Sequence, residues 1–241
     1  MRAVVFQPTP ALVCVPLILY NGTMKKVAVI FSGCGVYDGS EIHESVLILL
    51  ALDRANAQVV CAAPDIPQHH VTNHLNQQPV TSEMRNVLTE SARIARGNIV
   101  PLGQLKSADI DAVILPGGFG AVTNLCTYAL QGEKFGVNQE VSRLLQEVHK
   151  QGKPIGFVCI APAIGAKLFG PEKVEFTIGN DADTAAKLQT SGARHVACTV
   201  HNVVIDKRLK IVSTPAYMLA KRLTEAEAGI NKLVQAVLEM A

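Results

Sequence analysis

The chain has 241 residues, of which 49% are hydrophobic and 17% are charged, and its formal net charge is +2. This length is enough for one sizeable core, and a single α/β domain of this size is ordinary. Acidic and basic residues are interspersed, Trp is absent and aromatic residues are few. The composition therefore argues against a nucleic-acid groove, a base-stacking platform and a polybasic membrane anchor.

The cysteines are scattered singly, with no C-x-x-C pair and no His/Cys cluster at zinc spacing. They are Cys14, Cys34, Cys61, Cys126, Cys159 and Cys198. We interpret them as reduced thiols in a reducing compartment.

Residues 1–23 differ from the rest of the chain. Their apolar stretch, Ala11–Tyr20, is interrupted by Pro16 and is too short to span a bilayer. The next methionine, Met24, directly precedes a predicted strand. We predict an N-terminal extension over 1–23 and a single folded domain over 24–241. For the extension, a poorly ordered tail, an upstream start and a weak targeting segment all stay open.

The first elements alternate between strand and helix. A β-branched run over Val27–Phe31 predicts a buried strand, which ends in a glycine-rich loop that lacks the G-x-G-x-x-G spacing. Ser40 is the predicted N-cap of a helix that runs to about Ala55, and Gln58–Ala62 is the second strand. This rhythm predicts a doubly wound, mostly parallel sheet with helices on both faces, of the flavodoxin-like kind.

The remaining elements follow with less regularity. Between Pro64 and Thr81 three histidines, His69, His70 and His74, lie in a proline-rich loop, and we favour a solvated loop over a metal site. Helices are predicted over Ser82–Arg96, Thr123–Leu130, Gln139–Gln151 and Asp183–Ser191, with a final amphipathic helix capped by Thr224. Further strands are predicted over Asp111–Leu115, Pro154–Val158, Val174–Ile178 and Lys210–Ser213, and over Val196–Val200 and Val203–Ile205 as a possible hairpin.

Cys159 stands at the abrupt end of the apolar Pro154–Val158 run, where small, helix-compatible residues begin. Such a strand-to-helix turn delivers a nucleophile, and the N–H groups of the new helix favour its thiolate. A buried, inert cysteine is the alternative, and for a cysteine considered alone it is the commoner case.

Three strand ends carry glycine or cysteine, and ligands collect at the carboxyl ends of strands in a doubly wound sheet. The loop Pro116-Gly117-Gly118 leaves N–H groups free, so Gly118 and Ile160 are the predicted oxyanion hole for Cys159, with Gly117 shaping it. Glu41 and Glu44 follow the first loop. A buried glutamic acid there has a raised pKa and can donate a hydrogen bond to a thiolate, although a helix-dipole role is the alternative. Cys34 and Asn124 are further candidates to line the pocket.

These residues resemble the DJ-1/PfpI superfamily, which has the class I glutamine amidotransferase-like fold. The resemblance rests on Leu115–Gly120, the Cys159-Ile160-Ala161-Pro162 elbow and the acid-bearing first helix. It is closest to the ES1/ElbB branch, whose signatures are similar to Ser32–Glu44, Arg85–Leu88, Ala92–Gly97 and Ser213–Met218.

The resemblance implies roles for individual residues and an activity. Cys159 corresponds to the elbow cysteine, Glu44 to the glutamate that hydrogen-bonds it, and Gly118 and Ile160 to the oxyanion amides. Members of the ElbB branch are cofactor-independent glyoxalases that convert glyoxal to glycolate, and some are linked to isoprenoid biosynthesis. The resemblance thus implies a small aldehyde substrate, no metal or cofactor, a homodimer, and a cytoplasmic location, or a mitochondrial one in a eukaryote.

The chain departs from other branches of the superfamily at the position after the nucleophile, which is Ile160 where protease-like members have histidine. The region Phe176–Gly179, where other relatives place a histidine, has none. Peptidase and glutaminase chemistry need a general acid for the leaving amine, whereas aldehyde hydration does not. The runner-up function is a non-catalytic, redox-responsive protein in which an exposed Cys159 oxidises, with Cys34 either paired to it or separate.

Overall fold

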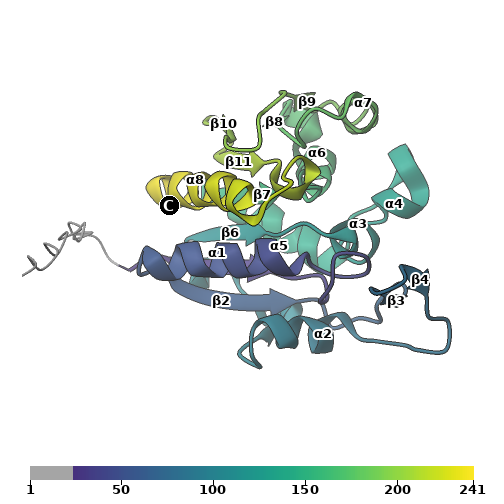
Figure 1. Cartoon of the computed structure of the whole chain (residues 1–241). Helices are drawn as coiled ribbons and strands as arrows, with labels where there is room; N and C mark the ends of the chain where they lie inside the picture. The colour runs from purple at the N-terminus through teal and green to yellow at the C-terminus, as the bar shows by residue number, and fades with distance from the viewer. Residues whose placement is uncertain (1–23) are drawn as a thin grey trace, which may run out of the picture.

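The computed structural model describes residues 24–241, so the predicted extension over 1–23 lies outside the described residues. Its centre is a seven-stranded sheet in the order β10-β11-β7-β6-β1-β2-β5 (Figure 1). These strands are β1 (Lys26–Ile30), β2 (Gln58–Ala63), β5 (Val100–Pro101), β6 (Ala112–Leu115), β7 (Ile155–Val158), β10 (Val204–Asp206) and β11 (Ile211–Thr214). Every pairing is parallel except that of β10 with β11. The predicted mostly parallel, doubly wound sheet is confirmed.

Two short strand pairs lie outside this sheet. They are β3 (Thr72–Asn73) with β4 (Gln78–Pro79), and β8 (Glu175–Phe176) with β9 (Arg194–His195). The α-helices are α1 (Ile42–Arg54), α2 (Val87–Ile94), α3 (Phe119–Thr123), α4 (Tyr128–Gln131), α5 (Gln139–Lys150), α6 (Pro162–Phe169), α7 (Ala182–Gln189) and α8 (Leu223–Met240). Single 3₁₀ turns span Leu102–Gln104, Ser107–Asp109, Gly132–Lys134, Gly170–Glu172 and Ala216–Met218.

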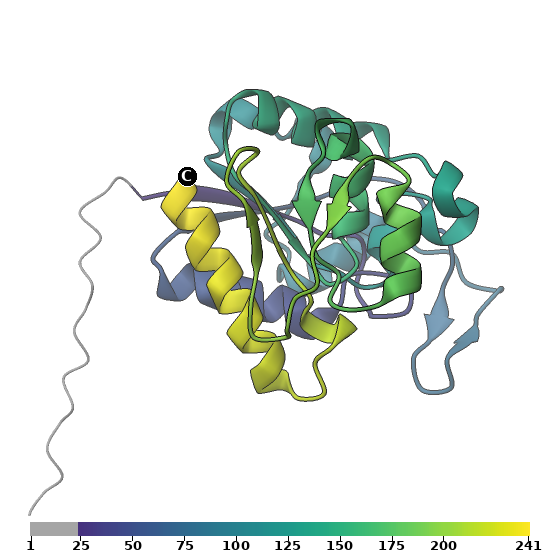
Figure 2. The same ribbon diagram turned by 90° about the horizontal axis from the view of Figure 1, so that it is seen from above.

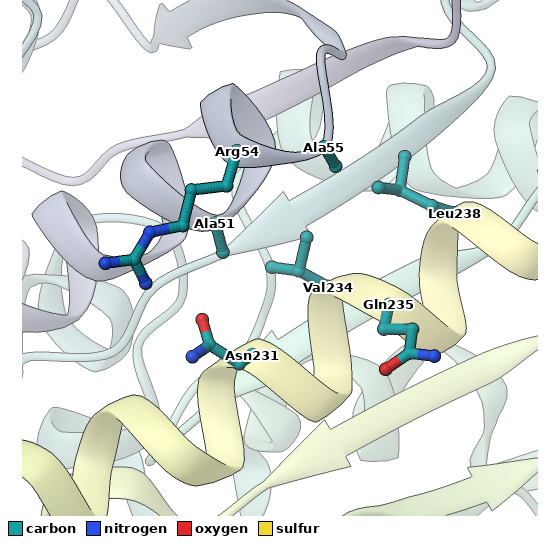
Figure 3. Close-up of a pocket in the computed structure, with 7 residues that line it drawn as sticks. All are labelled: Ala51, Arg54, Ala55, Asn231, Val234, Gln235 and Leu238. Atoms are coloured by element: carbon teal, nitrogen blue, oxygen red, sulfur yellow. The ribbon is translucent and has the colours of Figure 1, made fainter. Parts of the chain in front are cut away.

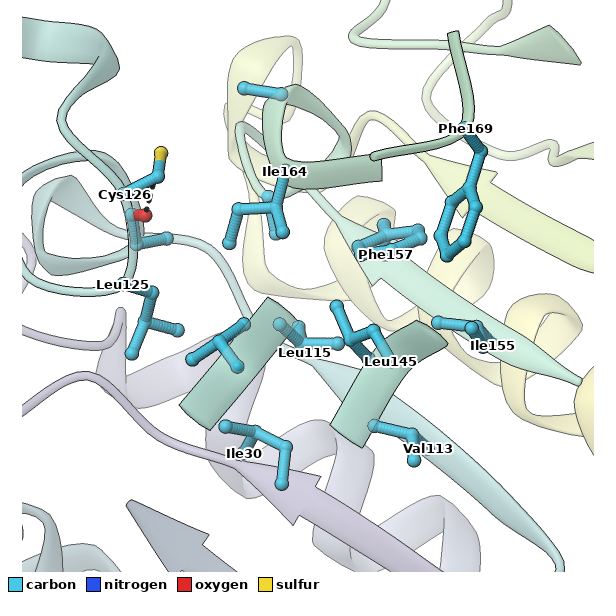
Figure 4. Close-up of a cluster of buried hydrophobic side chains, with 14 of the residues drawn as sticks. Ile30, Val113, Leu115, Leu125, Cys126, Leu145, Ile155, Phe157, Ile164 and Phe169 are labelled. Carbon is cyan, nitrogen blue, oxygen red and sulfur yellow. Dashed lines mark hydrogen bonds between the residues drawn. The ribbon is translucent and has the colours of Figure 1, made fainter. Parts of the chain in front are cut away.

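Alternate residues of the strands face two separate apolar layers, because successive side chains of a strand point to opposite faces. On β1, Val27 and Val29 pack with the buried faces of α1 and α8, which lie side by side in Figures 1 and 2. Ala28 and Ile30 pack on the other face with α5 and α6, in the cluster that Figure 4 shows. With both faces covered, the sheet is buried and its strand ends are the places where loops can form a site.

Helix boundaries differ from the prediction where side chains find other partners. The N-cap of α1 is Glu41 rather than Ser40, because the Ser40 hydroxyl is occupied by the Ser32 N–H at 2.8 Å. Helix α2 begins only after Asn86, whose side chain caps it.

Three further predictions are wrong. The Thr123–Leu130 segment is not one helix: α3 ends at Thr123 and α4 starts at Tyr128, because Cys126 between them pairs with Val137 in an isolated bridge. Residues 196–200 are not a strand, and the hairpin joins β10 to β11 instead. Thr224 lies inside α8, because the Glu225 carboxylate accepts from the Lys221 and Arg222 N–H groups and starts the helix earlier.

Candidate functional site

Cys159 stands at the turn between β7 and α6, as the sequence predicts. Its φ is +63°, in the left-handed region that costs a non-glycine residue about 1–3 kcal/mol. Its backbone N–H donates to the Thr214 carbonyl at the end of β11, 2.9 Å away. The neighbouring strand therefore helps to hold the strained turn, and the side chain is buried, with 7% exposure.

Glu44 is the buried acid of this site. It lies on α1 and is fully inaccessible to solvent. Its Oε2 accepts from the Gly117 N–H at 2.9 Å and its Oε1 from the Tyr217 N–H at 3.2 Å. The carboxyl interacts with the Cys159 thiol. Burial, and then the negative charge of Glu41, raise the pKa of Glu44 to about 8. The helix-dipole alternative does not account for a side chain held by two loop amides.

Burial and hydrogen bonding shift the pKa of the Cys159 thiol in opposite directions. Burial has the largest effect and, together with the charge of Glu44, raises the pKa of the thiol well above its ordinary value. The backbone N–H groups of Gly118 and Ile160 act on it as hydrogen-bond donors and lower the pKa. The two amides therefore favour the thiolate, as the sequence predicts, but desolvation outweighs them and the pKa of the thiol stays raised. The same burial contradicts the exposed Cys159 of the redox hypothesis.

Glu41 connects the first helix to the glycine loop. As the N-cap of α1 it accepts the Glu44 N–H at 2.6 Å through Oε2, while its own N–H donates to the Gly117 carbonyl at 3.0 Å. The side chain is buried, and burial raises the pKa of Glu41. Two carboxyl groups thus share one desolvated region. The negative charge of Glu41 is one reason why Glu44 holds its proton.

Gly117 occupies the narrow space between the nucleophile and the acid. A Cβ on this residue would lie 2.5 Å from the Cys159 Cβ, 3.0 Å from its Sγ and 2.8 Å from Glu44 Oε2. These separations are shorter than any ordinary contact, so glycine is required for the pair to meet. The next residue, Gly118, has a φ of +94° and packs against the Glu41 backbone.

We expect Gly117→Ala to destabilise the protein by about 1–3 kcal/mol, as overpacking does in cores, and to separate Cys159 from Glu44. Chemical denaturation measures the first effect, and the pH dependence of Cys159 alkylation measures the second. Gly136→Ala is the matched control, since nothing lies within 4 Å of a Cβ at that position. A Gly117→Ala protein with wild-type stability and wild-type alkylation would contradict this assignment.

Two residues predicted to line the pocket lie in other surroundings. The Asn124 amide donates to the Ser32 and Asp38 carbonyls, and its oxygen accepts the His69 N–H at 2.9 Å. Asn124 therefore joins three loops, and its polar atoms are occupied by backbone groups. Cys34 is half-buried near charged groups of α2 and the Asp38 loop, and both it and Cys159 are free thiols.

Sequence reasoning missed the contribution of the loop after β11. Tyr217 supplies the second N–H to Glu44, and its hydroxyl lies 2.9 Å from His43 Nδ1. The signal was present in the Ser213–Met218 segment, which the resemblance singled out without assigning it a role. Its backbone contacts, from the Thr214 carbonyl and the Tyr217 N–H, depend on β11 lying beside β7.

Comparison with known proteins identifies the family. No protein-family model matches the chain. Human "Glutamine amidotransferase-like class 1 domain-containing protein 3, mitochondrial" is 47% identical over 224 residues, covering 89% of this chain and 83% of the relative. "ES1 protein homolog, mitochondrial" of Rattus norvegicus is 46% identical over 224 residues, covering 89% of this chain and 84% of the relative.

Solved structures agree with this relationship. An isoprenoid biosynthesis protein with an amidotransferase-like domain from Ehrlichia chaffeensis superposes with a TM-score of 0.83 at 35% identity, covering 90% of this chain and all of that one. The DJ-1 superfamily protein Atu0886 of Agrobacterium tumefaciens has a TM-score of 0.53 at 15% identity, covering 90% of this chain and 89% of that one, and shows likeness of fold alone. The chain belongs to the ES1 family of glutamine amidotransferase-like class 1 domain proteins, and its fold is that of the DJ-1/PfpI superfamily.

Proposed function

We propose that the protein is a glutathione-independent glyoxalase that converts glyoxal, and related small α-oxoaldehydes, to 2-hydroxy acids. The observation that carries the proposal is the buried pair of Cys159 and Glu44, placed beside the Gly118 and Ile160 amides. The pair supplies a nucleophile, a proton carrier and two N–H donors, which is the set that aldehyde chemistry of this kind requires.

The reaction begins after Glu44 has lost its proton, so that the pair holds one proton, on the Cys159 thiol. As the Cys159 sulfur bonds to an aldehyde carbon, the Glu44 carboxylate takes the thiol proton and the Gly118 and Ile160 N–H groups stabilise the new alkoxide. Glu44 returns this proton to the alkoxide to give a hemithioacetal. The carbon bonded to sulfur then loses its C–H proton, and the neighbouring carbon, from the second aldehyde group, gains a proton. The product is a thioester of Cys159. Water then releases glycolate and the free thiol, so the balance is glyoxal plus water to glycolic acid.

Peptidase and glutaminase activities do not fit this site. The strongest influences on the Cys159 thiol, besides burial, come from Glu44 and the two amides, and none of these is a histidine. A leaving amine needs a general acid of that kind, whereas the proposed route has no amine to protonate.

The direct test is to incubate the full-length protein with glyoxal, without glutathione or added metal, and to follow glycolate by nuclear magnetic resonance. We expect glycolate to form in proportion to protein. Absence of glycolate at a protein concentration comparable with that of glyoxal would contradict the proposal.

A second candidate function comes from the Ehrlichia chaffeensis relative, which is named as an isoprenoid biosynthesis protein. By analogy we propose an accessory role in such a pathway as the alternative. A pull-down that recovers a biosynthetic enzyme with the Cys159→Ala variant as well as with wild type would favour this role over catalysis.

For the quaternary structure we propose a homodimer through the outer face of α1. Ile42, Val46 and Leu50 follow one another at four-residue intervals and are 41%, 48% and 37% exposed. Residues at this spacing form one stripe along a helix, and an exposed apolar stripe marks an interaction surface. The groove between α1 and α8, a cavity of about 260 Å³ lined by Ala51 and Val234 among others, lies on the same helix (Figure 3).

We expect Val46→Glu to convert a dimer to a monomer, because a buried charge without a partner in an apolar contact is strongly unfavourable. Light scattering coupled to gel filtration measures the mass. Leu75→Glu is the control, since Leu75 is 96% exposed in the β3–β4 turn and lies off the stripe. A monomeric wild-type protein, or a Val46→Glu protein that stays dimeric, would contradict the proposed interface.

For the location we propose mitochondria, because the human and rat relatives are named as mitochondrial proteins. Among residues 24–241 no helix is both long and apolar enough to cross a membrane. Cell fractionation with the full chain tests the location, and recovery in the cytosolic fraction alone would contradict it.

A further inference from the structure

Tyr217 is held at both ends by two consecutive residues of α1. Its backbone N–H donates to Oε1 of the fully buried Glu44 at 3.2 Å. Its hydroxyl lies 2.9 Å from His43 Nδ1 at the surface, and the centroids of the two rings are 5.8 Å apart. Glu44 has a part in the proposed reaction, whereas His43 and the Tyr217 hydroxyl have none so far. The outer contact therefore links the surface of α1 to the residue that holds the buried acid.

The turn that carries Tyr217 has a strained backbone. Ala216, directly before it, is buried and has a φ of +42°, in the left-handed region that disfavours a non-glycine residue. Such a conformation persists only where its surroundings hold it. On one side the turn continues from β11, which pairs with β7. On the other side Tyr217 fixes the turn to α1 through His43 and Glu44.

The hydrogen bond from Tyr217 is one of two that Glu44 accepts from loop amides. The other comes from the Gly117 N–H at 2.9 Å, in the narrow space beside Cys159. Burial and the charge of Glu41 raise the pKa of Glu44, whereas the Tyr217 N–H lowers it, because a hydrogen bond to a carboxylate favours the charged form. If the turn moved away from α1, the acid would therefore keep its proton to higher pH.

We propose that His43 and Tyr217 are positioning residues, and that the bond between their side chains keeps the Tyr217 N–H on the Glu44 carboxyl. Both act through the acid, which takes and returns the proton in the proposed reaction. Whichever side chain donates, the bond joins an exposed residue of α1 to the strained turn after β11. Its effect on turnover rests on the proposed function, whereas its effect on Glu44 can be measured without any substrate.

His43 has a second route to the acid, through its charge. Burial raises the pKa of Glu41, and the charge of His43 is among the influences that lower it. The titratable groups around Glu44 are Glu41 and His43 of α1, Cys159 of the β7–α6 turn and Tyr217 of the turn after β11. A change at His43 can thus reach Glu44 through Tyr217 or through Glu41. The first route requires the Tyr217 hydroxyl and the second does not.

The test follows the titration of Glu44 by the carboxyl carbon signal in nuclear magnetic resonance of full-length protein labelled at glutamate. Glu44→Gln identifies the signal, which should titrate at about pH 8 in wild type. Tyr217→Phe removes the hydroxyl and keeps the ring, and His43→Phe removes the ring nitrogens at similar size. We expect each change to raise the midpoint by about 0.5 pH unit, because a hydrogen bond to a charged group is weakened but not lost.

A double variant and a rescue distinguish the two routes. With both changes together the midpoint should match that of either single variant, since both break the same bond. His43→Asn should restore the wild-type midpoint, because asparagine offers a hydrogen-bonding atom near the position of Nδ1. Tyr128→Phe is the matched control, since Tyr128 is also half-buried but lies on α4 against Phe135. Additive shifts in the double variant, or no shift in the single variants, would overturn the proposal.

A second arm measures glycolate formation from glyoxal between pH 6 and 10. With Tyr217→Phe the inflection should move up by the same amount, so that turnover falls about threefold below it and is unchanged above it. A turnover that falls by one factor at every pH would indicate a merely structural effect and overturn the positioning role. If the wild type forms no glycolate, the proposed function fails, while the titration of Glu44 still decides the role of His43 and Tyr217.

Discussion

Replacing Cys159 by alanine is expected to lower glycolate formation from glyoxal at least about 1000-fold, because no covalent hemithioacetal can form without the sulfur. The small side chain fits the turn, since alanine retains the Cβ that packs beside Gly117. Glycolate formation under saturating glyoxal measures the loss, and the circular dichroism spectrum shows whether the fold is kept.

Cys198→Ala is the control for this variant, because Cys198 is also a free thiol but lies half-exposed near Lys232. It should keep wild-type activity. If Cys159→Ala forms glycolate at the wild-type rate, the hemithioacetal route is wrong even if the protein is a glyoxalase.

Replacing Glu44 by glutamine is expected to reduce turnover about 100-fold and to remove a pH dependence. In the wild-type protein the rate should rise as pH increases through about 8, the pKa of Glu44, because the carboxylate is the form that takes the thiol proton. Glutamine cannot accept that proton in any accessible pH range. A rate profile from pH 6 to 10 measures both effects.

Glu41→Gln is the matched control for the acid. It keeps an oxygen to cap the Glu44 N–H but removes the charge that raises the pKa of Glu44. The inflection should therefore move to lower pH rather than vanish. A profile that is the same in wild type, Glu41→Gln and Glu44→Gln would show that Glu44 does not carry the proton.

The same acid should link stability to pH. The pKa of Glu44 is about 8 in the folded protein, whereas an ordinary glutamate titrates near ~4.3. Between these values the folded protein holds a proton that the unfolded chain has released. The free energy of unfolding contributed by this group is therefore fully present below about pH 4 and is lost as pH rises through 8. Urea denaturation of wild type and Glu44→Gln across this window should show a shallower slope for the variant.

Local signals in the sequence were sufficient for the strands and most helices. The Val27–Phe31 and Pro154–Val158 runs predicted two central strands because both faces of a parallel strand are buried and apolar. The contacts of the Asn124 side chain could not be predicted from such local signals. Asn124 was a candidate to line the pocket, but its side-chain amide contacts three backbone groups from distant loops.

The predicted N-caps of the first and last helices were wrong because their surroundings in the folded protein could not be foreseen. A Ser, Thr or Asn before an apolar run predicts an N-cap, but the prediction assumes that the side chain has no better partner. The Ser40 hydroxyl has such a partner in the Ser32 N–H. The Glu225 carboxylate accepts the Lys221 and Arg222 N–H groups, so the last helix begins before Thr224. These partners are visible only after the chain has folded.

By itself the sequence determined the alternating α/β pattern and the strand-to-helix turn at Cys159, because both follow from local spacing and residue type. Spacing alone favoured a helix-dipole role for Glu44, and only the family resemblance singled it out as the acid. The tertiary structure decided the protonation state of the site. It placed β11 beside β7, so that Thr214 and Tyr217 hold the nucleophile and the acid, and it buried both. Burial disfavours the charged form of Cys159 more than the Gly118 and Ile160 amides favour it. No local sequence pattern indicates how deeply a side chain will be buried.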